Sequence, residues 1–145
     1  MTTQEDKQAY IDRMVSTRGY AQEYHKVLVQ NDYEVAVKAN ALVEEVLLKD
    51  RLLDRKTKEL IFIVGLTLLR AERRQIQDHI KVALALGVSK EMILEAIELS
   101  FMGGGFIAFQ QGLLAWQEVV GADRVEPSVD ALETFRQRSV EPKLP

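Results

Sequence analysis

Proline constrains the fold of this chain more than any other feature, because Pro127, Pro142 and Pro145 all fall in the last nineteen residues. Proline breaks a helix interior by removing a backbone donor and clashing with the preceding turn. Nothing before Pro127 forbids helix on that ground. Strand signals are also missing, since the sequence has no sustained alternation of apolar and polar residues and no Asn-Gly or Asp-Gly turn. The sequence therefore predicts an all-α fold.

Glycines and polar capping residues divide this all-α chain into about six helices. They are expected over residues 4–29 (an interruption near Gly19 is left open), 33–47, 55–70, 72–86, 90–102 and 106–120. Asp54 and Ser89 are expected as N-caps, and Gly87 as a left-handed C-terminal cap. The run Gly103–Gly105 should stop the fifth helix. A short amphipathic piece is expected around residues 129–135.

Length and composition indicate one domain. A chain of 145 residues with 47% hydrophobic residues is large enough for one core and too short for two comfortable ones. We therefore expect a single helical domain over residues 1–138 and a flexible C-terminal tail over 139–145.

Charge and residue usage exclude several classes of function. A net charge of −3 provides no basic field, so nucleic acid and anionic membrane are not expected partners. The longest apolar stretch, Leu60 to Leu69, is about half of what spans a bilayer. The chain has no cysteine and therefore no disulfide, thiolate nucleophile or thiolate metal site. With no apolar signal segment at the N-terminus, the expected compartment is the cytoplasm.

The fourth expected helix carries the most informative pattern. On a helical wheel, His79 falls on the apolar side, and Gln75 and Glu72 project from the same sector one and two turns earlier, respectively. One interpretation is a core histidine paired with a carboxylate. The other is a pocket in which burial and a carboxylate tune the histidine for proton transfer.

Other polar residues near this helix are candidates for the same pocket. Glu59 opens the most apolar helix, where it either favours the helix start or is buried as a functional carboxyl. Arg70 either neutralises helix carbonyls or, like Arg73, holds a substrate carboxylate. The glycine run around Gly104 indicates close backbone approach. Metal binding is not expected, because the two histidines form no ligand pair.

The order of these features resembles the carboxymuconolactone decarboxylase family, which includes the alkylhydroperoxidase D-like proteins. The matching residues are 54–61 (DRKTKELI), 78–84 (DHIKVAL), 86–97 (LGVSKEMILEAI) and 102–105 (MGGG). The resemblance covers about residues 33–120. Peroxide-reducing members carry a Cys-x2-Cys-x3-His motif, whose cysteine positions here are Glu72 and Gln75, so thiol peroxidase activity is excluded.

The resemblance implies an assembly and an activity. It implies a homotrimer or homohexamer, with a pocket where the helix bearing His79 meets the helix bearing Glu59. It favours a cofactor-independent decarboxylase acting on a small carboxylated lactone or related acid. His79 is then the acid–base group, and Glu59 is its partner or a second proton donor. The substrate-binding candidates are Glu72, Gln75, Arg70, Arg73 and Gly104.

Two alternatives to decarboxylation stay open. The chain could be a non-catalytic oligomeric protein that binds a small acid, or a lactone isomerase or hydrolase on the same scaffold, because a fold does not fix a function.

Overall fold

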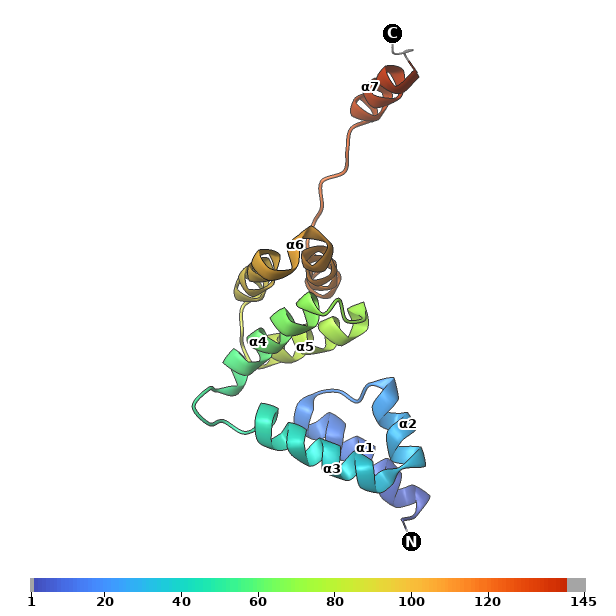
Figure 1. Cartoon of the computed structure of the whole chain (residues 1–145), viewed down its shortest axis with the longest axis vertical. Helices are drawn as coiled ribbons and strands as arrows, with labels where there is room; N and C mark the ends of the chain where they lie inside the picture. The colour runs from blue at the N-terminus through green and yellow to red at the C-terminus, as the bar shows by residue number, and fades with distance from the viewer. Residues whose placement is uncertain (1, 141–145) are drawn as a thin grey trace.

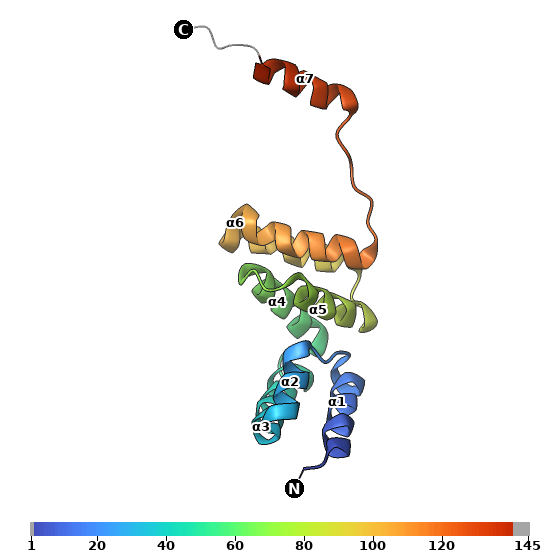
Figure 2. The ribbon, with the colours of Figure 1, turned by 90° about the vertical axis from the view of Figure 1, so that its right-hand side faces the viewer.

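The structure is a computed structural model that describes residues 2–140, and its regular elements are all helical. The described elements are α1 (Gln4–Arg18), α2 (Glu23–Asn31), α3 (Tyr33–Val43), the π-helical segment η1 (Glu44–Leu48), α4 (Arg55–Leu68), α5 (Arg73–Ala85), α6 (Lys90–Val120) and α7 (Val129–Val140). Helices α1 to α3 form one end, α4 and α5 lie in the middle, and α6 covers their far side (Figures 1 and 2). The predicted all-α fold is confirmed.

The expected caps form as the sequence indicates. Asp54 accepts from the backbone N–H of Thr57 at 2.8 Å, and Ser89 accepts from Met92 N–H at 3.1 Å. Gly87 has a φ of 84°, the left-handed conformation that relieves the end of α5. Local side-chain and backbone preferences therefore set these boundaries.

The interruption considered near Gly19 is present, because Gly19 adopts a φ of 93° and ends α1. Two other boundaries differ from those predicted. Helix α4 stops before Arg70, whose φ of 54° takes the backbone out of the helix. Glu72 has φ −52° and ψ 136°, so it is the extended N-cap of α5 and not its first turn.

The helix α6 is a hairpin of two antiparallel helices. Gly105 interrupts it with φ 64° and ψ −171°, as the glycine run predicts, although Gly103 and Gly104 stay helical. The indole N–H of Trp116 donates to the Lys90 carbonyl at 2.8 Å. In a straight helix those residues would be roughly 39 Å apart at 1.5 Å per residue, so the chain must reverse at Gly105. Figure 2 shows the two halves side by side.

The hydrophobic core lies where α4, α5 and the α6 hairpin meet. Isoleucines from all three helices are fully buried there: Ile63, Ile76, Ile80, Ile93 and Ile97. Gly112 brings the second half of α6 against Thr67 of α4, and Gly104 brings the first half against Leu68. Small residues at these two crossings let the helix backbones approach closely.

One helix of the described chain, α6, is long and apolar enough to cross a membrane, with a mean hydropathy of 1.5 over its best window. Because the chain reverses at Gly105, each half of α6 must be compared separately with the length that spans a bilayer. Neither half of the hairpin reaches the roughly 20 residues that a spanning helix needs.

Helix α7 lies apart from the rest of the described chain. The segment between Gly121 and α7 is extended, and α7 sits at its end in both views (Figures 1 and 2). The backbone stays helical to Val140, so residues 139 and 140 continue α7. The remainder of the expected flexible tail, 141–145, lies outside the described residues.

The crossing at Gly112 generates a stability prediction. A Cβ added at Gly112 would lie 2.6 Å from Thr67 Oγ1 and 2.9 Å from Ile97 Cγ2. We expect Gly112→Ala to lower the free energy of unfolding by about 1–3 kcal/mol, the usual cost of overpacking a core. Urea denaturation measures it.

Gly65 provides the matched control, because a Cβ there would meet nothing within 4 Å. In this helix interior Gly65→Ala should raise the free energy of unfolding by about 0.5–1 kcal/mol. Equal effects of the two substitutions would contradict the role assigned to the Gly112 crossing.

Candidate functional site

A cavity of about 380 Å³ lies between the N-terminal helices and the α4–α5 pair. Its volume is within the usual range for small-molecule sites. Apolar side chains of α3, η1 and α4 form most of the wall. The polar side chains that line it are Arg18, Tyr20, Gln22, Tyr24, Gln75 and His79.

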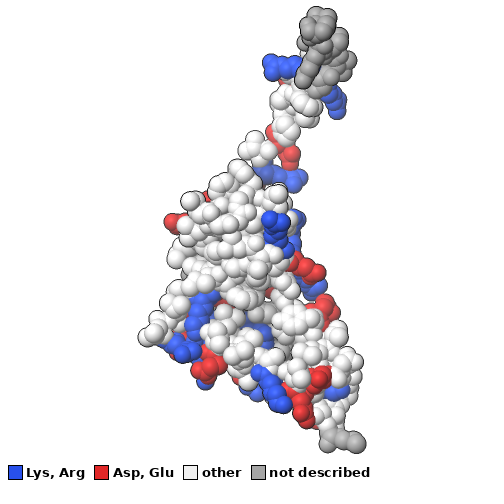
Figure 3. Space-filling view, in the orientation of Figure 1, with Lys and Arg blue, Asp and Glu red and all other residues white. Residues whose placement is uncertain are grey.

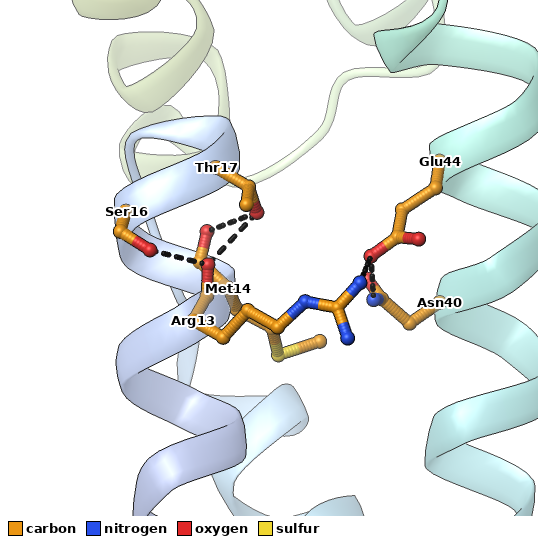
Figure 4. Close-up of polar contacts among 6 residues, drawn as sticks. All are labelled: Arg13, Met14, Ser16, Thr17, Asn40 and Glu44. Atoms are coloured by element: carbon orange, nitrogen blue, oxygen red, sulfur yellow. Dashed lines mark hydrogen bonds and ion pairs between the residues drawn. The ribbon is translucent and has the colours of Figure 1, made fainter.

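Polar contacts link α1 with α3 and η1 outside the lining of this cavity. Arg13 Nη2 lies 3.3 Å from Glu44 Oε1, and Asn40 Nδ2 donates to that oxygen at 2.9 Å. Figure 4 shows Arg13 reaching from α1 to the Glu44 carboxylate, which Asn40 also contacts. The side chain of Arg13 is 61% exposed, so this pair adds little stability by itself.

A chain of three charged or ionisable groups lies behind the cavity. Glu59 Oε2 is 2.8 Å from His79 Nδ1, and Arg55 Nε donates to Glu59 Oε1 at 2.7 Å. Glu59 has no solvent exposure and His79 is 2% exposed. Arg55 and Glu59 are four residues apart on α4, which places them on the same face. The prediction that Glu59 and His79 belong together agrees with this geometry.

The contact with Glu59 determines the chemistry available to His79. An ionised carboxylate only accepts hydrogen bonds, so it selects the tautomer with the proton on Nδ1. Nε2 is then the nitrogen left for a molecule in the cavity. The rings of Tyr20 and Phe62 contact the imidazole edge-on, with centroids 4.9 and 4.6 Å away. The imidazole is therefore held in one orientation.

Tyr20 adds a neutral donor to the same wall. Burial raises the pKa of its phenol and outweighs the positive charge of Arg18, which lowers it, while the negative charge of Glu59 adds a smaller increase. The hydroxyl thus stays protonated at neutral pH and can donate a hydrogen bond into the cavity.

Of the predicted substrate-binding residues, the structure brings only Gln75 into this cavity. Gln75 and His79 are one helical turn apart on α5. Glu72 is exposed and lines an adjoining surface hollow, which shares Gln22, Tyr24 and Gln75 with the cavity. The helical wheel placed Glu72 beside His79 because it assumed that Glu72 was helical.

The other predicted substrate-binding residues lie away from the cavity lining. Arg70 is exposed beyond the end of α4. Arg73 pairs with Glu118 of α6 at 2.7 Å. Gly104 packs against Leu68, the structural role that the glycine run indicates. Within residues 2–140 no group of three His, Asp or Glu side chains could hold a metal ion.

Sequence reasoning missed Arg18, Tyr20 and Arg55. The spacing of Arg55 and Glu59, four residues apart on one helix, was the available signal for that pair. Arg18 and Tyr20 gave no such signal, since they reach the cavity only because α1 ends against α5. A Cβ at Gly19 would lie 3.0 Å from Val82 of α5.

Comparison with known proteins now identifies the chain as a member of the carboxymuconolactone decarboxylase family. The model of that family matches residues 35–118, more than half of the chain. A search of curated proteins finds no match. The matched span contains Arg55, Glu59 and His79 but not Arg18 or Tyr20, so α1 and its connection to α2, which lie outside that span, supply part of the cavity.

His25 beside this cavity generates a prediction on pH. It is 7% exposed, and burial, with the nearby charge of Arg18, lowers its pKa from 6.5 to about 4. The unfolded chain therefore takes up a proton near pH 6.5, whereas the folded chain does so only near pH 4. Stability is full above pH 6.5 and falls as the pH drops toward 4.

We expect the free energy of unfolding to decrease by on the order of 2 kcal/mol across that window. In His25→Gln, which cannot titrate, the decrease should be smaller. Denaturant curves at several pH values measure both. An identical pH slope in the two proteins would contradict the assignment to His25.

Proposed function

We propose that this protein is a cofactor-independent carboxy-lyase acting on a small carboxylated lactone or related acid, with His79 as its acid–base group. The observation that carries the proposal is the buried contact of 2.8 Å between His79 Nδ1 and Glu59 Oε2 at the wall of a mostly apolar cavity. Membership of the family supports it.

The chemistry of decarboxylation fits this arrangement. When the carbon–carboxylate bond breaks, CO₂ leaves and its bonding electron pair moves into the conjugated lactone carbonyl as an enolate. That anion must be stabilised and then protonated. In the proposed reaction, protonated His79 delivers a proton from Nε2 to the carbon. Water then returns a proton to the imidazole.

Glu59 and Arg55 have supporting roles in this scheme. The carboxylate of Glu59 stabilises the imidazolium form of His79 before transfer and holds the ring in place. Arg55 balances the charge of Glu59, which is buried beyond reach of water. An uncompensated carboxylate at that depth would be strongly disfavoured. Tyr20 can donate to an oxygen of the enolate.

The lack of cysteine separates this chain from dithiol members of the family. Peroxide reduction by such members needs a thiolate nucleophile, and no residue of this sequence can supply one. Glu72 and Gln75 occupy the corresponding positions. Of these two, Gln75 faces the cavity and is proposed to contact substrate.

We further propose that the protein is a cytoplasmic homotrimer or homohexamer. Large apolar side chains are exposed on the α6 hairpin: Leu99 is 64% exposed, Met102 84%, Phe106 73% and Ile107 59%. Figure 3 shows uncharged surface over this part of the molecule. Apolar patches of this kind usually mark protein interfaces.

Assembly is tested by multi-angle light scattering on the purified protein. We expect a mass of three or six chains, and a lower mass for Phe106→Glu, which places a charge in the patch. Glu95→Gln, an exposed change in the first half of α6, is the control and should leave the mass unchanged. A monomeric wild type would overturn the proposed assembly.

The activity is tested by following CO₂ release from γ-carboxymuconolactone. His79→Asn should lower kcat by about 10²–10⁴-fold, the usual contribution of a general acid or base. Glu59→Gln should also lower kcat, because an amide stabilises the imidazolium poorly. Glu72→Gln makes the same change at an exposed position and should keep full activity.

Each other outcome selects a different function. Turnover without CO₂ release would indicate a lactone isomerase or hydrolase. Binding without turnover would indicate a small-acid-binding protein. Activity that survives in His79→Asn would overturn the proposed mechanism.

A further inference from the structure

Arg18 is a buried cation that the proposed chemistry does not yet use. It is the last residue of α1, is 3% exposed, and lines the same cavity as His79. Gly19 turns the chain immediately after it with a φ of 93°. The guanidinium is therefore fixed at the cavity by a helix end, and does not reach out to solvent.

No acidic side chain among the described residues pairs with this guanidinium. Its Nε and Nη2 atoms are buried and have no hydrogen-bond partner within residues 2–140. Its carbon Cζ lies 5.6 Å from the centroid of the Tyr20 ring, a cation–π contact. The ring balances part of the charge, and the Tyr20 hydroxyl also interacts with the guanidinium. Nε and Nη2 still have no partner among the described residues.

The remaining contact of Arg18 does not supply an acceptor either. Its Nη1 lies 3.3 Å from His25 Nε2, but His25 Nδ1 already accepts from the backbone N–H of Gln22 at 3.0 Å. A neutral imidazole has one acceptor nitrogen and one N–H. Because Nδ1 of His25 accepts, the ring proton is on Nε2. That N–H faces the Arg18 Nη1 donor, so it cannot accept a hydrogen bond from the guanidinium.

A buried guanidinium without an acceptor is disfavoured, because desolvation of the cation is not compensated. Such a group fits a site that receives an anion from outside. Arginine is suited to this, since its planar fork binds a carboxylate with two parallel hydrogen bonds. The apolar lining of the cavity suits a small carbon skeleton attached to that carboxylate.

We propose that Arg18 is the carboxylate-binding residue of this cavity, and that it holds a carboxylate which the substrate retains. The location supports the first part: the Tyr20 ring contacts both the guanidinium and the imidazole of His79, so one small molecule can reach both. The role considered for Arg70 or Arg73 then belongs to Arg18.

The choice of a retained carboxylate rests on the proposed decarboxylation. Loss of CO₂ withdraws negative charge from the departing carboxylate, so a guanidinium bound to that group would stabilise the ground state more than the transition state. Arg18 therefore suits a second carboxylate, one that the reaction leaves in place.

The subsite can be tested by binding, without any turnover. The probes are 2-furoate, 3-furanacetate and benzoate, with 2-furamide as the uncharged match, measured by isothermal titration calorimetry. We expect at least one of the three acids to bind the wild type, and 2-furamide to bind at least tenfold more weakly. Arg18→Met should weaken binding of that acid at least tenfold.

Arg13→Met is the control, because Arg13 lies on the same helix with its side chain largely exposed. It should bind the acid as the wild type does. The Tm without ligand provides a second readout. If Arg18 is held for a ligand, Arg18→Met melts at or above the wild-type temperature, whereas a structural arginine would make it melt lower.

If Arg18→Met does melt lower, Arg18→Lys decides the question, because it keeps the charge. Recovered binding of the acid supports the subsite, and absent binding overturns it. The subsite is also overturned if none of the three acids binds the wild type, or if Arg18→Met binds as tightly. Acid binding without CO₂ release would sustain the subsite while rejecting the decarboxylase and the retained-carboxylate assignment.

With γ-carboxymuconolactone as the substrate, Arg18→Met should raise KM by at least tenfold and change kcat less. A fall in kcat with KM unchanged would overturn the assignment to a retained carboxylate, because such a residue contributes binding and not chemistry.

Discussion

The full burial of the Glu59 carboxylate is the constraint on which the site depends. A charge so far from water requires partners, and each of its oxygens has one, His79 on α5 and Arg55 on α4. These contacts connect the two helices that carry the site. They also fix which nitrogen of His79 faces the cavity. The need to pair the buried Glu59 carboxylate therefore determines both how the two helices pack and which imidazole nitrogen is available to a ligand.

Local sequence signals predicted most of the helical framework. Asp54, Ser89 and Gly87 act at the ends of helices through their own side chains or backbone freedom, and the chain does break within its glycine run. The inward position of His79 followed from helical periodicity. The position of Glu72 could not be predicted in this way, because helical periodicity applies only inside a helix and Glu72 is the N-cap of α5. Arg18 could not be predicted at all, since its position depends on how α1 docks against α5.

The cavity has two origins within the chain. The part that matches the family supplies Glu59, His79 and the apolar face of α4, whereas the end of α1 and its connection to α2 supply Arg18, Tyr20 and Gln22. In the proposed scheme, the acid–base group and the carboxylate-binding arginine therefore come from different segments of the chain. Tyr20 joins the two, because its ring contacts both the Arg18 guanidinium and the His79 imidazole.

The π-helical segment η1 forms part of the cavity wall through Val46 and Leu47. A π-helical turn contains one residue more than the α-helical turn that it replaces, and such turns often occur at functional sites. Deleting one residue would restore an α-helix and rotate everything beyond it by about 100°. The shape of this wall thus depends on how many residues the segment contains as well as on which residues they are. A single insertion or deletion in the segment would change which side chains face the cavity.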